Sequence, residues 1–203
     1  MSRVGSVLAV MAHPDDPELW AGGTLALHAR TAPVIAAVQA HDAVRNAEAL
    51  AGGKALGAEV VLAEALDAAV VTELILRHRP EILITHPIDD VHPDHRRIAA
   101  AVMEGLVDAV IATGHPKKLY ACDSYNSLTL SGPVAGSVIV DVTATFEQKM
   151  TALREHRSQP ITDHFGPMAE NLGALWGARI GASRAEAFTA LPILGRLPGT
   201  AHL

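Results

Sequence analysis

Short apolar runs alternate with longer amphipathic stretches along this chain of 203 residues. Apolar runs of this length are typical of strands buried on both faces of a sheet. The runs that predict strands are residues 4–10, 34–38, 59–62, 81–85, 117–121 and 137–140. The stretches that predict helices are residues 17–30, 42–56, 67–79, 93–113 and 145–157.

Capping residues mark several of these helix ends. Asp16 is a plausible N-cap with Pro17 at the first helical position, and Gly57 and Gly114 suit C-caps. Residues 131–136, SGPVAG, are the best loop candidate of the second half. Two later segments allow two interpretations each. Residues 163–183 fit one or two helices, and residues 185–191 fit a final strand or a short helix.

Strands that alternate with helices of this length favour parallel pairing through right-handed crossovers. The predicted fold is therefore a three-layer α/β sandwich of Rossmann type with a mostly parallel sheet. At this length, without an internal repeat or a low-complexity linker, residues 1–203 are expected to form a single domain.

Composition narrows the class of partner. Hydrophobic residues make up 49% and charged residues 19% of the chain, which indicates a globular protein. The net charge of −6 argues against nucleic acid or an anionic membrane as the partner. Cys122 is the single cysteine, which excludes an intrachain disulfide framework and fits a reducing cytoplasm. No run is long enough to span a bilayer, and the N-terminal apolar run has the wrong shape for a signal peptide.

Two polar clusters follow predicted strands. The first is His13-Pro14-Asp15-Asp16, directly after the first strand, and the second spans residues 89–96, soon after the fourth. Ligands of open parallel sheets bind at the carboxyl ends of strands, near the point where strand order reverses. If the order is 3-2-1-4-5, strands one and four are neighbours and both clusters open into one crevice.

The residue types in these clusters suit metal chemistry. His and Asp are ordinary ligands of catalytic zinc, which uses three protein ligands and a water molecule. A further Asp in the same turn, off the metal, can take the proton of that water. Either cluster alone would usually be a turn or a polar helix start, but the pair at the ends of two central strands indicates a functional site.

Other site signatures are missing or weak. No G-x-G-x-x-G follows the first strand and no G-x-S-x-G occurs, which disfavours a nucleotide-binding domain and a serine hydrolase. The context of Cys122 does not mark a nucleophile. Gly22 and Gly23, inside the first predicted helix, are interpreted as small residues that allow close packing.

At these residues the sequence resembles the PIG-L/LmbE-like deacetylases, metal-dependent N-acetylglucosaminyl de-N-acetylases and their relatives. Residues 12–16, AHPDD, with Glu18-Leu19 and residues 22–25, GGTL, are similar to the family's opening motif. Residues 92–96, HPDHR, are similar to its second motif. Weaker likenesses extend over most of the chain, at Arg45, Glu48, Leu56-Gly57, residues 147–159 and Glu186-Ala187-Phe188.

The resemblance implies a function and residue roles. The expected reaction is zinc-dependent removal of an N-acetyl group from an amino-sugar-containing or related natural-product substrate, which releases acetate and a free amine. His13, Asp16 and His95 would hold the metal, which could be Zn²⁺ or another divalent ion such as Fe²⁺. Asp15 would be the general base, and His92 would stabilise or protonate the reacting centre.

Two further residues have weaker assignments. Asp94 is the candidate to hydrogen-bond the outer nitrogen of a ligating imidazole. Arg45 is a candidate for gripping substrate hydroxyl or anionic groups, and a salt bridge with Glu48 is the equal alternative.

The sequence departs from the family pattern in two places. Pro17 stands where many members carry Glu. Only residues 39–44, QAHDAV, connect the second strand to its helix, where many members have ten or more residues. That loop commonly shapes the substrate pocket, so the sequence does not identify the substrate.

The alternatives are a zinc amidase acting on a non-sugar amide or a larger acyl group, and a metal-binding domain without catalysis. The expected partner is a small N-acetylated molecule, and a homo-oligomer is left open.

Overall fold

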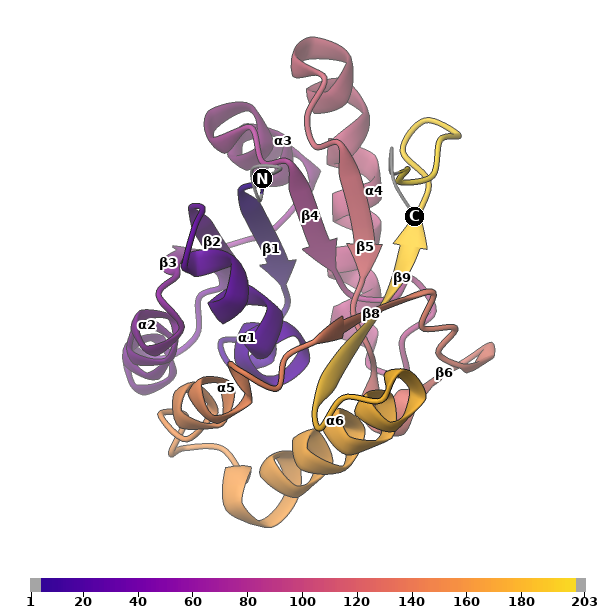
Figure 1. Ribbon diagram of the computed structural model, residues 1–203. Helices are drawn as coiled ribbons and strands as arrows, with labels where there is room; N and C mark the ends of the chain where they lie inside the picture. Colours follow the sequence, from indigo (N-terminus) through magenta and orange to yellow (C-terminus); the bar gives the residue numbers. More distant parts are fainter. Residues whose placement is uncertain (1–4, 200–203) are drawn as a thin grey trace.

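A seven-stranded sheet forms the middle of the computed structural model, which describes residues 5–199 (Figure 1). The strand order is β3-β2-β1-β4-β5-β9-β8. The strands are β1 (Val7–Met11), β2 (Val34–Gln39), β3 (Glu59–Ala63), β4 (Ile82–Thr85), β5 (Lys118–Ala121), β8 (Val138–Asp141) and β9 (Ala185–Leu191).

The first five strands are parallel, and their order matches the predicted 3-2-1-4-5. The last two strands extend the sheet at one edge, since β9 pairs antiparallel with β5 and β8 pairs antiparallel with β9. The predicted mostly parallel α/β fold is therefore confirmed.

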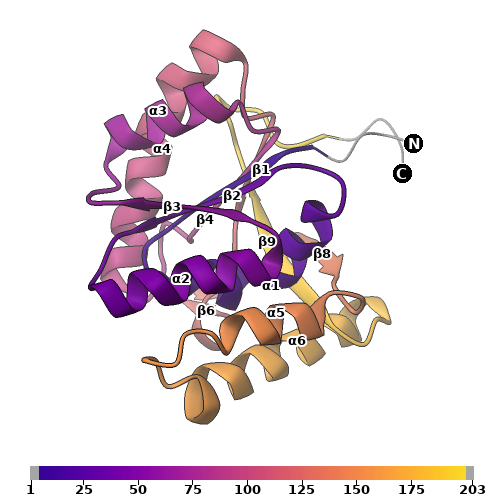
Figure 2. The ribbon, with the colours of Figure 1, turned by 90° about the vertical axis from the view of Figure 1, so that its left-hand side faces the viewer.

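Helices cover both faces of the sheet, which gives three layers (Figure 2). On one face lie α1 (Asp16–Ala29), α2 (Ala43–Leu56), α5 (Phe146–Leu153) and α6 (Gly166–Ile180). On the other face lie α3 (Ala68–His78) and α4 (Pro93–Thr113). None of these helices, within residues 5–199, is long and apolar enough to cross a membrane.

Alternating residues of β1 supply both halves of the core. Val7 and Met11 pack into the cluster shared with α1, α2 and α5, whereas Leu8 and Val10 pack into the cluster shared with α3 and α4. Successive side chains of a strand point to opposite faces, so a strand covered on both sides must be apolar throughout. This is why the central strands appear as unbroken apolar runs in the sequence.

Four of the helix ends follow the capping rules. Asp42 and Asp67 cap α2 and α3 through side-chain hydrogen bonds, and Gly57 and Gly114 end α2 and α4 with positive φ. The prediction that Asp16 caps α1 is wrong, because the helix begins at Asp16 and Asp15 holds the N-cap position without a side-chain cap.

The second half differs from the prediction in detail. The helix predicted over 145–157 ends at Leu153, and the loop predicted over 131–136 contains β7 (Gly132–Pro133), which pairs with β6 (Leu128–Thr129). The segment 163–183 contains most of a π-helical turn over Ile161–Phe165, followed by the single helix α6.

The glycine pair in α1 serves close packing, as predicted. A Cβ atom at Gly23 would lie 2.7 Å from Val142 Cβ, and one at Gly22 would lie 3.0 Å from Lys149 Cγ. Next to this contact, both carboxylate oxygens of Glu186 accept backbone N–H groups of α1, at 2.9 Å from Gly23 and 2.8 Å from Thr24. Lys149 Nζ pairs with the same carboxylate at 2.7 Å. Buried polar groups from α5 and β9 therefore fix α1, the helix that starts at the polar cluster.

Candidate metal-binding active site

The two polar clusters meet at the carboxyl ends of neighbouring strands. The turn after β1 carries His13 and Asp16, and the loop after β4 leads into α4, whose first turn carries His95. Nδ1 of His13 lies 3.1 Å from Oδ2 of Asp16 and 3.3 Å from Nε2 of His95, and His95 Nε2 lies 3.4 Å from Asp16 Oδ1. Two segments far apart in the sequence thus bring three side chains together, with His13 facing Oδ2 and His95 facing Oδ1 of Asp16.

The distances from His95 Nε2 to His13 Nδ1 and to Asp16 Oδ1, 3.3 and 3.4 Å, match those between ligands of a tetrahedral ion. Ligands at ~2.0–2.2 Å from a tetrahedral zinc lie about 3.3–3.6 Å from one another. The charge also suits a cation. Burial acts to raise the pKa of Asp16, but the charges of His95 and His86 hold that pKa well below its usual range. Burial acts to lower the pKa of His95, yet Asp16 and Asp90 outweigh it and raise that pKa to about 9. Without a metal, a proton on His95 therefore balances the buried carboxylates.

Each imidazole has a carboxylate behind it. Oδ1 of Asp90 lies 3.2 Å from Nδ1 of His95, and both side chains are fully buried. Oδ2 of Asp94 lies 3.7 Å from Nε2 of His13. Asp94, proposed from the sequence for this role, therefore faces His13, while Asp90, which sequence reasoning missed, faces His95. The signal for Asp90 was available, since it precedes the HPDH motif by two residues and also accepts the His92 N–H at 2.8 Å.

His86 is a second residue that the sequence reasoning missed. Its ring stacks on His95 at 3.8 Å between centroids, and its Nε2 lies 3.2 Å from Asp16 Oδ2. Two groups among the described residues have metal-ligand spacing: one is Asp16, His86 and His95, and the other is His13, His92 and His95. However, Nε2 of His86 accepts the backbone N–H of Ala12 at 3.0 Å, so its lone pair is already used. The geometry therefore favours His86 as a support for Asp16 and His95 over a ligand.

Asp15 lies beside these donors but belongs to neither group with metal-ligand spacing. Its side chain is 7% exposed, and its Oδ1 accepts from Nη2 of Arg45, on α2, at 2.8 Å. Burial and the charge of Asp16 raise the pKa of Asp15 against the opposing charge of Arg45. A raised pKa brings a carboxylate closer to the range of an effective general base.

The contact of Arg45 differs from the ion pair considered from the sequence. Arg45 does not pair with Glu48, because its guanidinium turns inward to Asp15. Glu48 instead accepts from the backbone N–H and the hydroxyl of Ser158, at 2.8 and 2.6 Å. This pair of contacts joins α2 to the segment that follows α5.

His92 lies on the solvent-exposed side of the site, called its mouth below, and 34% of its side chain is exposed. Its ring meets His13 edge-on at 4.8 Å, and its Nδ1 accepts the backbone N–H of Asp94 at 3.2 Å. Burial and the charges of His95 and His13 lower the pKa of His92. A neutral imidazole that accepts at Nδ1 carries its hydrogen on Nε2, so His92 offers a donor there. His13, His92 and His95 also have metal-ligand spacing, which leaves His92 close enough to meet a bound ion.

Two further features border the site. The Tyr125 ring stacks on His95 at 5.8 Å and meets Trp20 edge-on at 5.1 Å, while Trp20 Nε1 donates to Asp16 Oδ1 at 3.0 Å. Behind Asp15, the buried Glu18 and His156 pair at 3.3 Å. A Cβ atom at position 52 would lie 2.6 Å from Glu18 Oε1, so Gly52 makes room for this pair.

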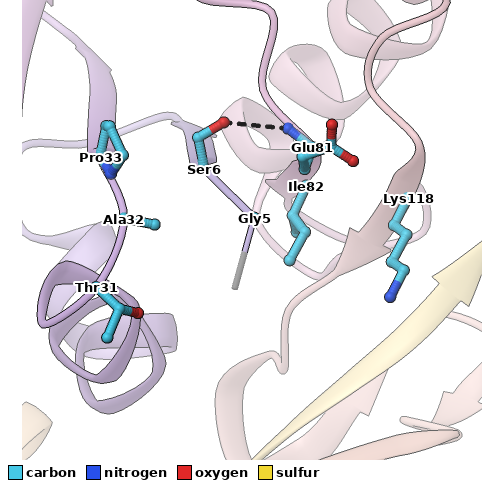
Figure 3. A pocket seen from close by; sticks show the side chains of 8 residues that line it. All are labelled: Gly5, Ser6, Thr31, Ala32, Pro33, Glu81, Ile82 and Lys118. Atoms are coloured by element: carbon cyan, nitrogen blue, oxygen red, sulfur yellow. Dashed lines mark hydrogen bonds between the residues drawn. The ribbon is translucent and has the colours of Figure 1, made fainter. Parts of the chain in front are cut away.

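A cavity of about 460 Å³ lies at the opposite end of the sheet (Figure 3). It borders the first residues of β4 and β5, and the Ser6 hydroxyl accepts the Glu81 N–H within it. Its lining has none of the His and Asp donors described above and consists of Gly5, Ser6, Thr31, Ala32, Pro33, Glu81, Ile82 and Lys118.

No family model matches the sequence. Several solved structures share its fold. An N,N'-diacetylchitobiose deacetylase from Pyrococcus horikoshii, solved with an inhibitor, aligns with a TM-score of 0.73 and 21% identity over 92% of this chain and 84% of that one. A conserved protein from Thermus thermophilus aligns with a TM-score of 0.75 and 24% identity, over 92% and 95% of the two chains.

A deacetylase triple mutant from the teicoplanin biosynthetic pathway aligns with a TM-score of 0.67 and 18% identity, over 92% and 98% of the two chains. Likeness at these identities establishes the fold. The resemblance to PIG-L/LmbE-like deacetylases, drawn from the sequence motifs, is therefore confirmed at the level of the fold.

Proposed function

We propose that this chain is a metal-dependent N-deacetylase that hydrolyses the acetamide of an amino-sugar-containing or related natural-product substrate. One observation carries the proposal. His13 Nδ1 lies 3.1 Å from Asp16 Oδ2 and 3.3 Å from His95 Nε2, His95 Nε2 lies 3.4 Å from Asp16 Oδ1, and the buried carboxylate of Asp15 lies beside these side chains. A site that only stored a metal would have no use for the extra carboxylate.

His13, Asp16 and His95 are the residues that would hold the metal, and Zn²⁺ is the ion that their types favour, although Fe²⁺ also accepts two His and one carboxylate. When bound, such an ion lowers the pKa of a coordinated water to ~7 and polarises a carbonyl group. Asp90 and Asp94 keep the two imidazoles oriented through their outer nitrogens.

Asp15 is the proposed general base. Arg45 holds its Oδ1, which leaves Oδ2 to take the proton of the attacking water. Attack on the acetyl carbon places negative charge on the former carbonyl oxygen. His92, with its hydrogen on Nε2, is positioned at the mouth to donate to that oxygen. Asp15 then returns its proton to the leaving nitrogen, so that acetate and a free amine result.

The test is acetate release by the purified protein, stripped with a chelator and reloaded with Zn²⁺ or Fe²⁺. The substrates are N-acetylglucosamine, its glycosides and a panel of N-acetylated non-sugar amines. We expect acetate only from metal-loaded protein and only from the amino-sugar compounds. Acetate release from the non-sugar amides alone would make the chain an amidase of another class. Tight metal binding with no turnover on any amide would leave a binding domain and contradict the proposal.

A further inference from the structure

Four aliphatic side chains lie exposed beside the mouth of the site. The exposed fractions are 57% for Ile88, 41% for Val91, 49% for Leu128 and 68% for Leu130. Single exposed aliphatic residues are ordinary, but a contiguous group marks a binding surface more often. We call these four residues the aliphatic ribbon.

The ribbon is built from two segments that pair. Asp90 and Thr129 form an antiparallel bridge, and the Leu130 N–H donates to the Asp89 carbonyl oxygen at 2.8 Å. This register sets Val91 opposite Leu128. Asp90 is fully buried behind His95, whereas Val91 is 41% exposed, so these two neighbouring side chains point to opposite sides. The same pairing that supports the proposed ligand His95 therefore presents the ribbon to solvent.

Both segments of the ribbon continue directly into the site. Val91 precedes His92, which stands at the mouth. Leu128 follows three residues after Tyr125, whose ring stacks on His95. The ribbon therefore borders the side of the site that His92 and Tyr125 form. Next to it lies a hollow of about 190 Å³, whose lining includes Ile88, Ala121, Val134 and Leu191.

The size of the ribbon distinguishes between occupants. Four partly exposed side chains offer much less area than the ~800 Å² that each partner contributes to a stable protein interface. That area suits one apolar substituent of a small molecule better than a second copy of the chain. Within the ribbon's segments Asp89 is the one carboxylate that faces outward, and Thr129 binds it at 2.8 Å.

We propose that the aliphatic ribbon binds an apolar aglycone of the substrate, so that the enzyme acts on conjugates in which an N-acetylated amino sugar carries an uncharged hydrocarbon group. This inference rests on the proposed function and adds a substrate class to it.

The experiment compares methyl and hexyl glycosides of N-acetylglucosamine with the zinc-loaded protein. We expect kcat/KM for the hexyl glycoside to exceed that for the methyl glycoside by about tenfold or more, since burying each methylene is favourable. Leu130→Ser and Leu128→Ser should remove most of this preference while leaving kcat/KM on the methyl glycoside unchanged.

Ile111→Ser is the matched control. Ile111 is 72% exposed on α4 and lies 16 residues beyond His95, about 24 Å along the helix, so this variant should keep the full preference. Equal kcat/KM for the two glycosides, or a preference that survives Leu130→Ser, overturns the proposal. So does a dimer, measured by sedimentation, that Leu130→Ser dissociates without changing the chain-length preference.

Failure of the proposed function gives a different result. If neither glycoside releases acetate, calorimetric binding of the two glycosides to wild type and Leu130→Ser still tests the ribbon. Tighter binding of the hexyl glycoside by wild type alone supports the subsite, and equal binding by both proteins contradicts it.

Discussion

Asp15, Asp16 and Asp90 carry the same functional group but differ in what they contact. Asp16 faces the imidazoles of His13, His86 and His95, Asp90 lies behind His95, and Asp15 binds Arg45. At the residue scale these partners fit the three proposed roles: ligand, support for a ligand, and base. Substitutions that remove one carboxylate at a time separate the roles.

Asp15→Asn should keep stoichiometric metal and lose turnover by about 10²–10⁴-fold, because it removes the proton acceptor and leaves the donor atoms in place. His95→Ala should lose metal instead. Elemental analysis after dialysis, combined with acetate-release kinetics, measures both effects. Equal metal loss in the two variants would make Asp15 a ligand and refute its role as base.

Asp90→Ala should weaken metal binding by about 10–100-fold, since carboxylates that orient ligating imidazoles have effects of this size. Asp94→Ala is the matched control. It should have a smaller effect, because Asp94 is 47% exposed and lies 3.7 Å from His13, whereas Asp90 is buried and lies 3.2 Å from His95. Competition with a chelating dye measures both affinities, and a larger loss in Asp94→Ala would contradict the assignment.

The metal-free protein should lose stability as the pH rises from 6.5 to about 9. Burial opposes the protonated form of His95, but Asp16 and Asp90 outweigh it and raise the pKa from 6.5 to about 9. A group whose pKa is higher in the folded than in the unfolded state stabilises the fold when it is protonated. The contribution of His95 is therefore complete below pH 6.5 and is lost as the pH rises to about 9.

Urea unfolding of chelator-treated wild type and His95→Gln at pH 6, 7.5 and 9.5 tests this dependence. The difference in unfolding free energy between the two proteins should shrink by a few kcal/mol, because each unit of pKa shift corresponds to about 1.4 kcal/mol. A difference that is constant across this range would show that His95 is neutral in the folded protein.

The motif residues could be anticipated from the sequence because their chemistry and spacing are local. HPDD and HPDH place His and Asp at the ends of two apolar runs, and parallel pairing of those runs brings them together. The residues that contact these motif residues are harder to predict from the sequence. His86 appears in the sequence as one His after a strand, and only the fold shows that it stacks on His95. Arg45 could not be paired with Asp15 before the position of α2 was known.

At the scale of elements, boundaries were predictable where capping residues are strong. The helix predicted over 93–113 matches α4, which Pro93 begins and Gly114 ends. The helix predicted over 145–157 is longer than α5, which ends at Leu153. The sequence gives no local signal for this end, because no Gly or Pro follows Leu153 until Pro160. The chain instead turns at Arg154, so that His156 reaches Glu18 and Ser158 reaches Glu48. Tertiary contacts, which local sequence does not encode, end that helix.

The close approach of α1 gives a prediction at this scale. Gly23→Ala should destabilise the fold by about 1–3 kcal/mol, because the new methyl group would lie 2.7 Å from the branched Cβ of Val142. Gly22→Ala is the comparison, with a contact of 3.0 Å to a Lys149 methylene. Alanine favours a helix over glycine by about 1 kcal/mol at both positions, so the difference reports the contact. Equal thermal stabilities of the two variants would show that the residues around Gly23 shift to accommodate the added methyl group.

At the scale of the whole molecule, strand order decides which loops surround the site. β1 lies between β2 and β4, so the loops after β2 and β4 flank the cluster from two sides. The loop after β4 and the β6–β7 hairpin form one wall. On the other side, only three residues, 40–42, separate β2 from α2. The sequence indicated this short connection, whereas the β6–β7 wall depends on the pairing of Asp90 with Thr129, far along the chain, and could not be anticipated.

The short connection should leave the β2 side of the site open to bulky substrates, because loops at the carboxyl ends of strands normally close such sites. Inserting about ten Gly and Ser residues between Ala40 and His41 tests this expectation. The insertion leaves the contacts of His41 with Asn46 and the Asp42 cap of α2 intact, and a longer surface loop costs little stability. We expect kcat/KM for bulky N-acetylglucosamine conjugates to fall severalfold, while kcat/KM for the free monosaccharide stays within about twofold, since only remote substrate groups meet the added residues. An equal loss on both substrates would indicate damage to the site, and no loss on either would show that the β2 side takes no part in admitting the substrate.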